Sequence, residues 1–367
     1  RSVPRFFIQE GNGWESGGII SKTGSICEEA NSMKIRYIGK FPPPYGGVTI
    51  KNKLLYQELS GHIPIIRLKE RKGIPSFLHQ IANFMTAFFK NQRLVIGISS
   101  RGGKSKLMTD MLYYLNRRVM QESLYFMMGG TEANDVAQDK NAIRQYSHYK
   151  TIFVETRRME QCLIDAGLQN VSVFPNCRKR PGREYSPAET GRQMRCVFFS
   201  LISPDKGSDL VLEAAKALPD VLFDFYGHIE PGYEEPFRKQ IDGLPNAVYH
   251  GLFKTEGENV YDRLHEYDLL LLPTKCKTEG VPGVLVEAKI AAVPAVVSDI
   301  AYNAEIIEDG RNGTVLSSND AAALTQAIAR LDVDRETLYH LKTGAKTSAE
   351  QYYIETYLPE ILNKLEE

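Results

Sequence analysis

The sequence is poor in cysteine and in long apolar runs, and each shortage excludes a class of protein. Its 367 residues hold five scattered cysteines and no Cys-x-x-Cys pair, so we expect neither a disulfide framework nor a zinc site. Free thiols of this kind fit a reducing cytoplasm. No apolar run approaches the roughly 18 residues that a membrane-spanning helix needs. The seven histidines show no metal-binding spacing and no catalytic triad.

The net charge of zero conceals a division along the chain. From Met33 to Met120 there are 16 Lys/Arg against three acidic residues, a net charge of +13. From Cys196 to Glu367 there are 15 basic against 29 acidic residues, a net charge of −14. The first region therefore suits an anionic substrate or an anionic membrane surface. For any single side chain, a solvated surface position is the alternative.

The chain divides into an opening segment, two larger domains and a terminal helix. Residues 1–32 show no convincing periodicity and no apolar core of a signal peptide, whereas Met33 opens a clean strand. We expect Met33 to be the natural start, and residues 1–32 to be an added or upstream segment or a loosely docked extension. The polar segment Arg178–Arg195 is predicted to be a linker. The expected domains are residues 33–190 and 191–345, with a helix at 346–367 that packs back toward the first domain.

Both domains alternate strand, loop and helix, which predicts an α/β fold with mainly parallel sheets. The predicted strands are short apolar runs: Ile35–Gly39, Ile63–Leu68, Leu94–Ile98, Ser123–Met128, Thr151–Glu155, Val171–Pro175, Cys196–Ser200, Val221–Tyr226, Ala247–His250, Leu269–Leu272 and Pro294–Val297. The predicted helices are 46–58, 76–90, 104–118, 135–147, 156–166, 207–218, 233–241, 258–265, 284–292, 320–330 and 335–366. The pattern therefore predicts two halves, each built as a doubly wound sheet.

The stretch from Pro273 to Asp299 carries the most informative pattern. Glu279 follows a buried strand in a polar loop, at the strand end where open α/β sheets bind ligands. Glu287 lies early in the next helix, where a carboxylate suits the helix dipole. Carboxylates accept hydrogen bonds from vicinal hydroxyls, and a helix start suits a phosphate. The pattern therefore predicts a nucleotide-sugar site, whose turn comprises Gly280, Val281, Pro282, Gly283 and Val284.

Each domain also opens with a turn suited to phosphate. Gly46 and Gly47 follow the first strand in FPPPYGGV, where glycine lets the backbone approach a ligand closely. Lys206, in SPDKG, follows the first strand of the second domain and suits a diphosphate. An ordinary turn and a surface lysine are the alternatives.

A basic loop, GISSRGGKS, nearly matches the P-loop pattern, but five residues rather than four separate Gly97 from Gly103. We expect Arg101 and Lys104 to face a phosphate or an acceptor rather than to form a true P-loop.

Two further features each have two interpretations. His250 ends a predicted strand and either contacts a nucleotide base or is structural. The segment Ile74–Lys90 is amphipathic and rich in phenylalanine. It either lies on a membrane or packs one face into the core.

Taken together, the motifs resemble those of retaining GT-B glycosyltransferases of the group-one type, also called family 4. The resemblance covers about Met33 to Tyr357. It rests on FPPPYGGV, VFPN, SPDKGSDLVLEAAKAL and TEGVPGVLVEAKIAAVPAVVSD, with IIEDGRNGTVL behind them. The chain departs from the family at Ser200-Leu201, where many members have arginine. It departs again at Met128-Gly129-Gly130-Thr131, where many have histidine.

The resemblance implies two Rossmann-like domains with the active site between them. Glu279 and Lys206 would be catalytic, and Glu287 would bind the donor ribose. The further donor-binding positions would be Gly46, Gly47, His250 and the turn Gly280–Val284. Acceptor or phosphate contacts would be Arg101, Lys104, Gly129 and Gly130.

The resemblance also implies the partners. The donor would be a UDP- or GDP-sugar acting as substrate, with no cofactor and no metal. The acceptor would be a glycan or lipid-linked molecule of bacterial surface polysaccharide or lipopolysaccharide synthesis. We expect a cytoplasmic protein, peripheral on the inner face of the plasma membrane through its basic first domain, and no nucleic-acid partner.

Two other hypotheses stay open. The departures from the family motivate a catalytically degenerate GT-B protein that binds a sugar nucleotide or supports a partner transferase. The basic loop motivates a nucleotide phosphotransferase that depends on Lys104.

Overall fold

A computed structural model of the chain describes residues 34–42, 46–67, 76–98, 102–189, 192–253 and 259–367. Residues 1–32, expected to be an added segment or extension, lie outside the described residues. Four cysteines of the described ranges are free thiols, and Cys27 lies outside those ranges. Among the helices of these ranges, none has the length and apolar character to cross a bilayer.

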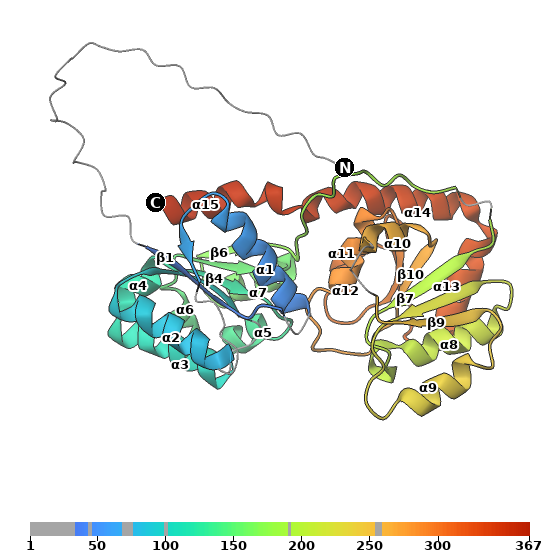
Figure 1. Ribbon diagram of the computed structural model, residues 1–367, viewed down its shortest axis with the longest axis horizontal. Coiled ribbons are helices and arrows are strands. Elements are labelled where there is room, and N and C mark those ends of the chain that lie inside the picture. The colour runs from blue at the N-terminus through green and yellow to red at the C-terminus, as the bar shows by residue number, and fades with distance from the viewer. Residues whose placement is uncertain (1–33, 43–45, 68–75, 99–101, 190–191, 254–258) are drawn as a thin grey trace, which may run out of the picture. The chain divides into compact units, whose positions relative to one another are not determined.

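The amino-terminal half is built on a six-stranded parallel sheet in the order β2-β1-β3-β4-β5-β6 (Figure 1). Parallel sheets are covered on both faces, so their strands read as apolar runs. The strands are β1 (Ile35–Gly39), β2 (Ile65–Ile66), β3 (Arg93–Ile98), β4 (Leu124–Met127), β5 (Thr151–Val154) and β6 (Val171–Val173). The helices are α1 (Gly47–Ser60), α2 (Ser76–Phe89), α3 (Gly103–Leu115), α4 (Arg117–Gln121), α5 (Glu132–Ala137), α6 (Lys140–Tyr146) and α7 (Arg157–Asp165).

The carboxyl-terminal half repeats this plan with the order β12-β11-β10-β7-β8-β9, again all parallel. The strands are β7 (Arg195–Phe199), β8 (Leu222–Tyr226), β9 (Ala247–Gly251), β10 (Leu269–Leu272), β11 (Ala295–Ser298) and β12 (Gly313–Leu316). The helices are α8 (Ser208–Ala217), α9 (Glu234–Ile241), α10 (Val260–His265), α11 (Gly283–Ile290), α12 (Asn303–Ile306), α13 (Ala321–Val333) and α14 (Arg335–Ser348).

The strand order of each sheet contains one reversal. In the second sheet the chain runs outward through β7, β8 and β9 and then returns to place β10 on the other side of β7. In the first sheet β1 is flanked by β2 and β3 in the same way. Loops that leave two such strands diverge and open a crevice at their carboxyl ends, where α/β sheets bind ligands. The loops after β7 and β10 are therefore the first place to look for a site.

The helical region predicted at about 335–366 consists of separate helical segments. Helix α14 ends at Ser348, two short 3-10 turns follow at Ala349–Tyr352 and Ile354–Thr356, and α15 spans Leu358–Glu366. Helix α15 packs on the amino-terminal half, where Ile361 and Leu365 join the core cluster of Ile35. The residues from Lys34 to Glu367 form one compact unit.

Helix boundaries within the first domain also differ. The predicted helix 135–147 is two helices, because Asp139 accepts hydrogen bonds from the amides of Asn141 and Ala142 and starts α6 as its N-cap. The predicted helix 104–118 is divided in the same way, since Asn116 ends α3 and caps α4. The strand β12 and the short helix α12 were not predicted.

Candidate functional site

Two side chains meet at the carboxyl ends of β7 and β10. Lys206 ends a short 3-10 turn after β7, and its Nζ forms an ion pair with Oε1 of Glu279. The Lys206 and Glu279 side chains are 18% and 16% exposed. The structure thus brings together the two residues that the resemblance assigned to catalysis, and it places them at the strand reversal of the second sheet.

The two loops that carry this pair are fixed to each other. Gly207 has a φ of +80°, and a Cβ there would lie 2.1 Å from the carbonyl oxygen of Pro273. The carbonyl of Asp205 accepts the Lys275 N–H at 2.7 Å and the Thr274 hydroxyl at 3.2 Å. Only glycine fits this left-handed, close approach, so the SPDKG turn is shaped by the loop beside it.

The second oxygen of Glu279 is a polar atom without a partner. Its Oε2 is buried, and no group of the described residues donates a hydrogen bond to it. Buried polar atoms in folded proteins are nearly always paired, and the missing partner is commonly an ordered water, an ion or a ligand group. A hydroxyl group beside Glu279 would satisfy this oxygen.

The predicted phosphate turn is held by side chains of the amino-terminal half. The Val281 N–H donates to Oε2 of Glu155 at 3.2 Å, and the Val281 carbonyl accepts from Asn176 Nδ2 at 2.8 Å. The Val281 amide is therefore engaged within the chain. Helix α11 begins at Gly283 with Pro282 as N-cap, so the amides of Gly283 and Val284 lie in the first turn, which has no intrahelical acceptors.

Glu155 is itself buried against a lysine. Its other oxygen, Oε1, forms an ion pair with Nζ of Lys51 from α1, and both side chains are 4% exposed. Burial lowers the pKa of the Lys51 ammonium to about 7, where the nearby Cys177 opposes the shift and the Arg178 guanidinium adds to it. The pair lies between α1 and the Val281 turn, so it links the start of the first domain to the donor loop.

Glu287 is bound by an arginine that the sequence analysis placed in a linker. Nε and Nη2 of Arg178 both lie 2.9 Å from Oε1 of Glu287. Arg178 also donates to Asn176 Oδ1 at 2.8 Å and to the Cys177 carbonyl at 2.9 Å. A Cβ on Gly283 would lie 2.1 Å from Nη2 of Arg178, so a larger residue there would displace the guanidinium. Glu287 remains 18% exposed beside this arginine.

Gly129 and Gly130 pack on the Glu279 loop. A Cβ on Gly130 would lie 2.3 Å from the Glu279 carbonyl oxygen, and the Tyr302 hydroxyl donates to the Gly130 carbonyl at 2.9 Å. Gly280 in turn has the Gly129 and Gly130 backbone within 3.5 Å of its own Cβ position. The absence of side chains in this turn therefore has a packing reason.

Gly46 and Gly47 lie at the start of α1 and are exposed. A Cβ at either position would meet no described atom within 4 Å. The φ of Gly46 is −166°, an extended conformation that any residue adopts. Packing within the described residues therefore does not require these glycines, which leaves open space at this helix start.

The basic loop GISSRGGKS is described only in part. Gly97 lies inside β3, where a Cβ would meet the Asn52 side chain at 1.8 Å, so the first glycine of the pattern is a strand residue. Arg101 and the side chain of Lys104 lie outside the described residues. In the described part of the chain, no group of His, Cys, Asp and Glu side chains is arranged to hold a metal ion.

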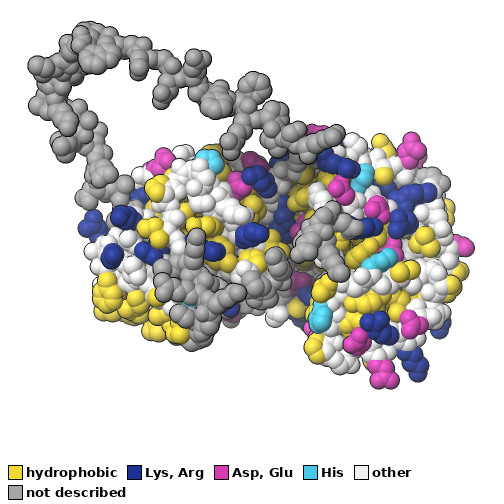
Figure 2. Space-filling model, viewed as in Figure 1, with side chains coloured by type: hydrophobic (Ala, Val, Ile, Leu, Met, Phe, Trp, Pro, Cys, Tyr) yellow, Lys and Arg dark blue, Asp and Glu magenta, His cyan; other side chains and the backbone are white. Residues whose placement is uncertain are grey.

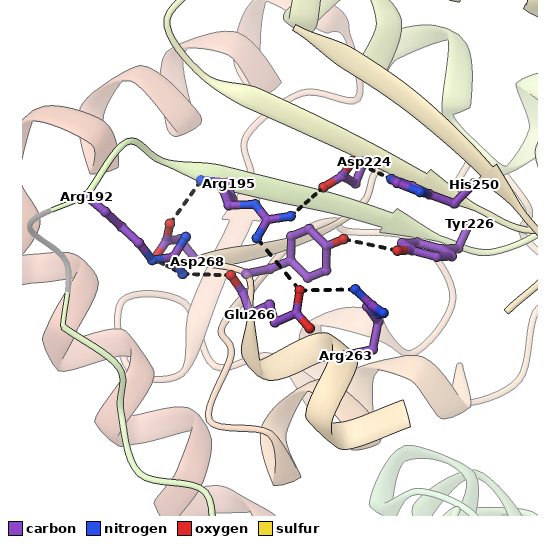
Figure 3. Close-up of polar contacts among 9 residues, drawn as sticks. Arg192, Arg195, Asp224, Tyr226, His250, Arg263, Glu266 and Asp268 are labelled. Atoms are coloured by element: carbon purple, nitrogen blue, oxygen red, sulfur yellow. Dashed lines mark hydrogen bonds and ion pairs between the residues drawn. The ribbon is translucent and has the colours of Figure 1, made fainter. Parts of the chain in front are cut away.

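His250 joins a polar network on β7, β8 and β9 (Figure 3). Its Nε2 lies 2.6 Å from Oδ1 of Asp224, and its ring stacks on Tyr226 with centroids 4.6 Å apart. Asp224 also pairs with Arg195 at 3.0 Å, and Arg195 lies 3.8 Å from Glu266. His250 is about one-third exposed, so its ring keeps one open side while Asp224 fixes its orientation.

The sequence analysis did not select five residues that shape the site: Lys51, Glu155, Asn176, Arg178 and Tyr302. Asn176 lies in the VFPN motif, which supports the family resemblance but does not by itself give Asn176 a role in the site. No pattern in the sequence marks Arg178 as a site residue, because its segment is polar and contains Pro and Gly. Glu155 ended a predicted strand, a position at which polar side chains gather in α/β folds.

Comparisons with known proteins show what part of the chain, and its fold, resemble. Residues 187–348 match the family described as glycosyl transferases group 1. The chain is 34% identical to an exopolysaccharide phosphotransferase of Streptomyces coelicolor, over 51% of this chain and 20% of that protein. It is 27% identical to the amylovoran biosynthesis glycosyltransferase AmsK of Erwinia amylovora, over 47% of this chain and 45% of that protein.

The fold has a solved counterpart in HepE of Anabaena, crystallised in complex with UDP. The TM-score is 0.68 at 17% identity, covering 91% of this chain and 99% of that one. The chain spans less than half the length of the two curated relatives above. Residues 187–348 thus match the glycosyl transferases of group 1, and the chain has a GT-B fold of two Rossmann-like domains.

Proposed function

We propose that this chain transfers a sugar from a UDP- or GDP-sugar to a glycan or lipid-linked acceptor. The product belongs to bacterial surface polysaccharide or lipopolysaccharide, and the transfer retains the configuration at the anomeric carbon. The observation that carries the proposal is the Lys206–Glu279 pair, in which Glu279 Oε2 is buried and without a partner in the described residues. The proposal includes no cofactor and no bound metal.

The roles follow from the chemistry of each group. Glu279 Oε2 accepts a hydrogen bond from a hydroxyl of the donor sugar, which supplies its missing partner. Lys206 turns from Glu279 to the diphosphate and stabilises the negative charge that develops as the diphosphate leaves. Glu287, held by Arg178, accepts hydrogen bonds from the ribose hydroxyls. The open space at Gly46 and Gly47 admits the phosphates from the other domain.

The names of the similar proteins support this assignment. One relative is an amylovoran biosynthesis glycosyltransferase, and another acts on exopolysaccharide. HepE of Anabaena binds UDP on the same fold. We extend this nucleotide preference to the present chain, whose site offers carboxylates and a lysine for the same kind of ligand.

The test is transfer activity across a panel of UDP- and GDP-sugars. Glu279→Gln keeps the side-chain volume but removes its charge, and we expect it to lower transfer by at least about 100-fold. Lys206→Met should have an effect of the same order. Glu213→Gln on the exposed face of α8 is the matched control and should leave activity unchanged. Addition of a chelator should also leave the wild-type rate unchanged.

Full transfer by a folded Glu279→Gln protein would refute the assignment. A product with inverted anomeric configuration, read by nuclear magnetic resonance, would contradict the retaining mechanism alone. Loss of activity on chelation would contradict the metal-free mechanism alone.

A second candidate function is binding without turnover. It is favoured by the departures from the family pattern at Ser200-Leu201 and at Met128-Gly129-Gly130-Thr131, where the usual arginine and histidine are missing. Calorimetry with the donor panel distinguishes the two functions. A donor that binds but is neither hydrolysed nor transferred would support the second.

A further inference from the structure

We propose that the outward faces of α2 and α3 form a docking surface for an anionic lipid bilayer. Six large apolar side chains stand on these faces, and we call them the α2–α3 patch: Leu78, Ile81, Phe89, Leu107, Tyr114 and Leu115. This inference goes beyond the transfer reaction, because none of these residues belongs to the site around Glu279.

The patch is strongly exposed. Phe89 is 73% exposed, and Tyr114 and Leu115 are each 71% exposed. Single exposed apolar side chains are normal, but a group of them on one face marks an interaction site. Figure 2 shows hydrophobic side chains gathered at the lower left of the molecule, where Figure 1 places α2 and α3.

Each of the two helices carries apolar side chains on an inner face and also on an outer face. Their inner faces place Phe84 and Ala87 of α2, and Met108 and Leu112 of α3, in the core of the first domain. On α2, Leu78, Ile81 and Phe89 follow one another at spacings of three and eight residues, and on α3 Leu107 and Tyr114 are seven residues apart, which keeps each set on one side of its helix. The core therefore uses only one face of each helix and leaves the second apolar face without a partner in the described residues.

The two outer faces form one surface because the helices are fastened side by side. Nδ2 of Asn116, which ends α3, donates to the Phe88 carbonyl and to Oδ1 of Asn91 at the end of α2, both at 2.8 Å. This contact aligns the end of α3, with Tyr114 and Leu115, beside the end of α2, with Phe89.

The charge around the patch identifies the partner. From Ser76 to Gln121 the sequence has seven Lys/Arg and one acidic residue, Asp110. Oδ1 of Asp110 accepts a hydrogen bond from Gln145 on α6 at 2.6 Å, which directs it away from the patch. Exposed Lys90, Lys106 and Arg118 remain, and within the described ranges no carboxylate pairs with them.

Apolar side chains within a basic rim fit the interface of an anionic bilayer, which takes up the apolar groups and attracts the cations. Two aromatic residues, Phe89 and Tyr114, add side chains suited to the headgroup region. A second copy of the chain is a poorer occupant, because a two-fold contact would bring the same basic rim against itself.

The experiment is co-sedimentation of the full chain with vesicles of phosphatidylcholine, alone or mixed with phosphatidylglycerol. We expect the protein to partition onto the anionic vesicles at least about tenfold better than onto the neutral ones. Phe89→Ser combined with Leu115→Ser should reduce that binding about tenfold, since it removes two strongly exposed apolar groups. Lys106→Glu combined with Arg118→Glu should reduce it on anionic vesicles alone.

The matched control is Val333→Ser combined with Tyr339→Ser. Both residues are exposed apolar side chains of the carboxyl-terminal half, 87% and 46% exposed, and this variant should bind vesicles as the wild type does. Thermal unfolding is the check that each variant is folded, and we expect all of them to fold because the substitutions are at exposed positions.

Two outcomes would overturn the proposal. One is failure of the folded wild-type chain to bind anionic vesicles. The other is equal binding by the wild type and the Phe89/Leu115 variant. A dimer that dissociates on the Phe89/Leu115 change, without vesicle binding, would assign the face to a second copy instead. None of these outcomes depends on transfer activity, so the patch and the proposed reaction fail separately.

Discussion

The amino-terminal and carboxyl-terminal halves share a six-stranded parallel sheet but differ in the state of their charged side chains. In the acidic carboxyl-terminal half, carboxylates are tied into internal pairs, as in Asp268 with Lys342 at 2.7 Å, both fully buried. In the basic amino-terminal half, cations such as Lys90 and Lys106 stand exposed on α2 and α3. One architecture therefore serves two purposes, because function resides in the groups placed on a fold.

The comparison also shows how the halves depend on each other. The region that matches the family, residues 187–348, supplies Lys206, Glu279 and Glu287. The side chains that hold the donor loop in place, Glu155 and Arg178, lie outside that region. The matched region alone does not fix its own site geometry, and this dependence can be tested.

The largest effect is expected from Arg178→Ala. The change leaves Glu287 without its partner at 18% exposure, and breaking a buried pair from one side costs about 3 kcal/mol of unfolding free energy. Chemical denaturation measures the loss. Arg180→Ala is the matched control, since Arg180 pairs with Glu350 at 48% and 64% exposure, and exposed pairs contribute about 0–1 kcal/mol. Equal losses in the two variants would contradict a structural role for Arg178.

Gly130→Ala tests the same dependence through packing. The added methyl would lie 2.3 Å from the Glu279 carbonyl oxygen, so the Glu279 loop must move. We expect kcat/KM for transfer to fall about 100-fold, the usual effect of a displacement of about 1 Å at a reacting centre. Gly182→Ala, where a Cβ meets no described atom within 4 Å, should leave kcat/KM unchanged. Unaltered activity in Gly130→Ala would show that the two loops do not couple.

Lys289→Met tests the carboxyl-terminal half by itself. Burial lowers the pKa of Lys289 from 10.5 to about 8. Between about pH 8 and 10.5 the unfolded chain keeps a proton that the folded chain has lost, so wild-type stability rises with pH there. The variant should lack this rise and be more stable at pH 7 by about 2 kcal/mol. Denaturation across this range is the measurement, with the exposed Lys216→Met as control. A rise that persists in Lys289→Met would have another source.

The smallest effect on the fold is expected from Gly47→Ala. No described atom lies within 4 Å of the new methyl, so unfolding free energy should change by less than about 0.5 kcal/mol. If donor phosphates approach this helix start, the Kd for the donor should rise about tenfold by calorimetry. Gly103→Ala, at the first position of α3 with the same open space, is the control. Unchanged affinity would remove Gly47 from the site.

The sequence predicted the buried strands well because strands of a parallel sheet are short apolar runs. The predicted bounds of β1 and β10 agree with the structure at both ends. The break between α14 and α15 has one local signal that the prediction missed, Pro359 in the first turn of α15. That break is fixed by a distant contact, in which the Arg178 N–H and carbonyl bond to the backbone of Tyr352 and Ile354.

The residues of the site also fall into those that a local motif predicted and those that it did not. Lys206 and Glu279 were selected from local motifs, and the structure places them in contact. Glu155 and Lys51 are separated by 104 residues, and no local pattern connects them. Composition marked the Arg178 segment as a linker, but composition carries no information about which residue Arg178 contacts.

The position of α15 has a consequence for how the protein is made. Its residues Ile361 and Leu365 complete a core that begins with Ile35 and Tyr37. During synthesis, the part of this core that α15 covers therefore stays exposed until α15 has left the ribosome, after the whole second domain has been translated. Exposed apolar surface of this kind promotes aggregation in large proteins. The amino-terminal half is thus first to be synthesised and last to be completed, and we expect newly made chains to need protection in that interval.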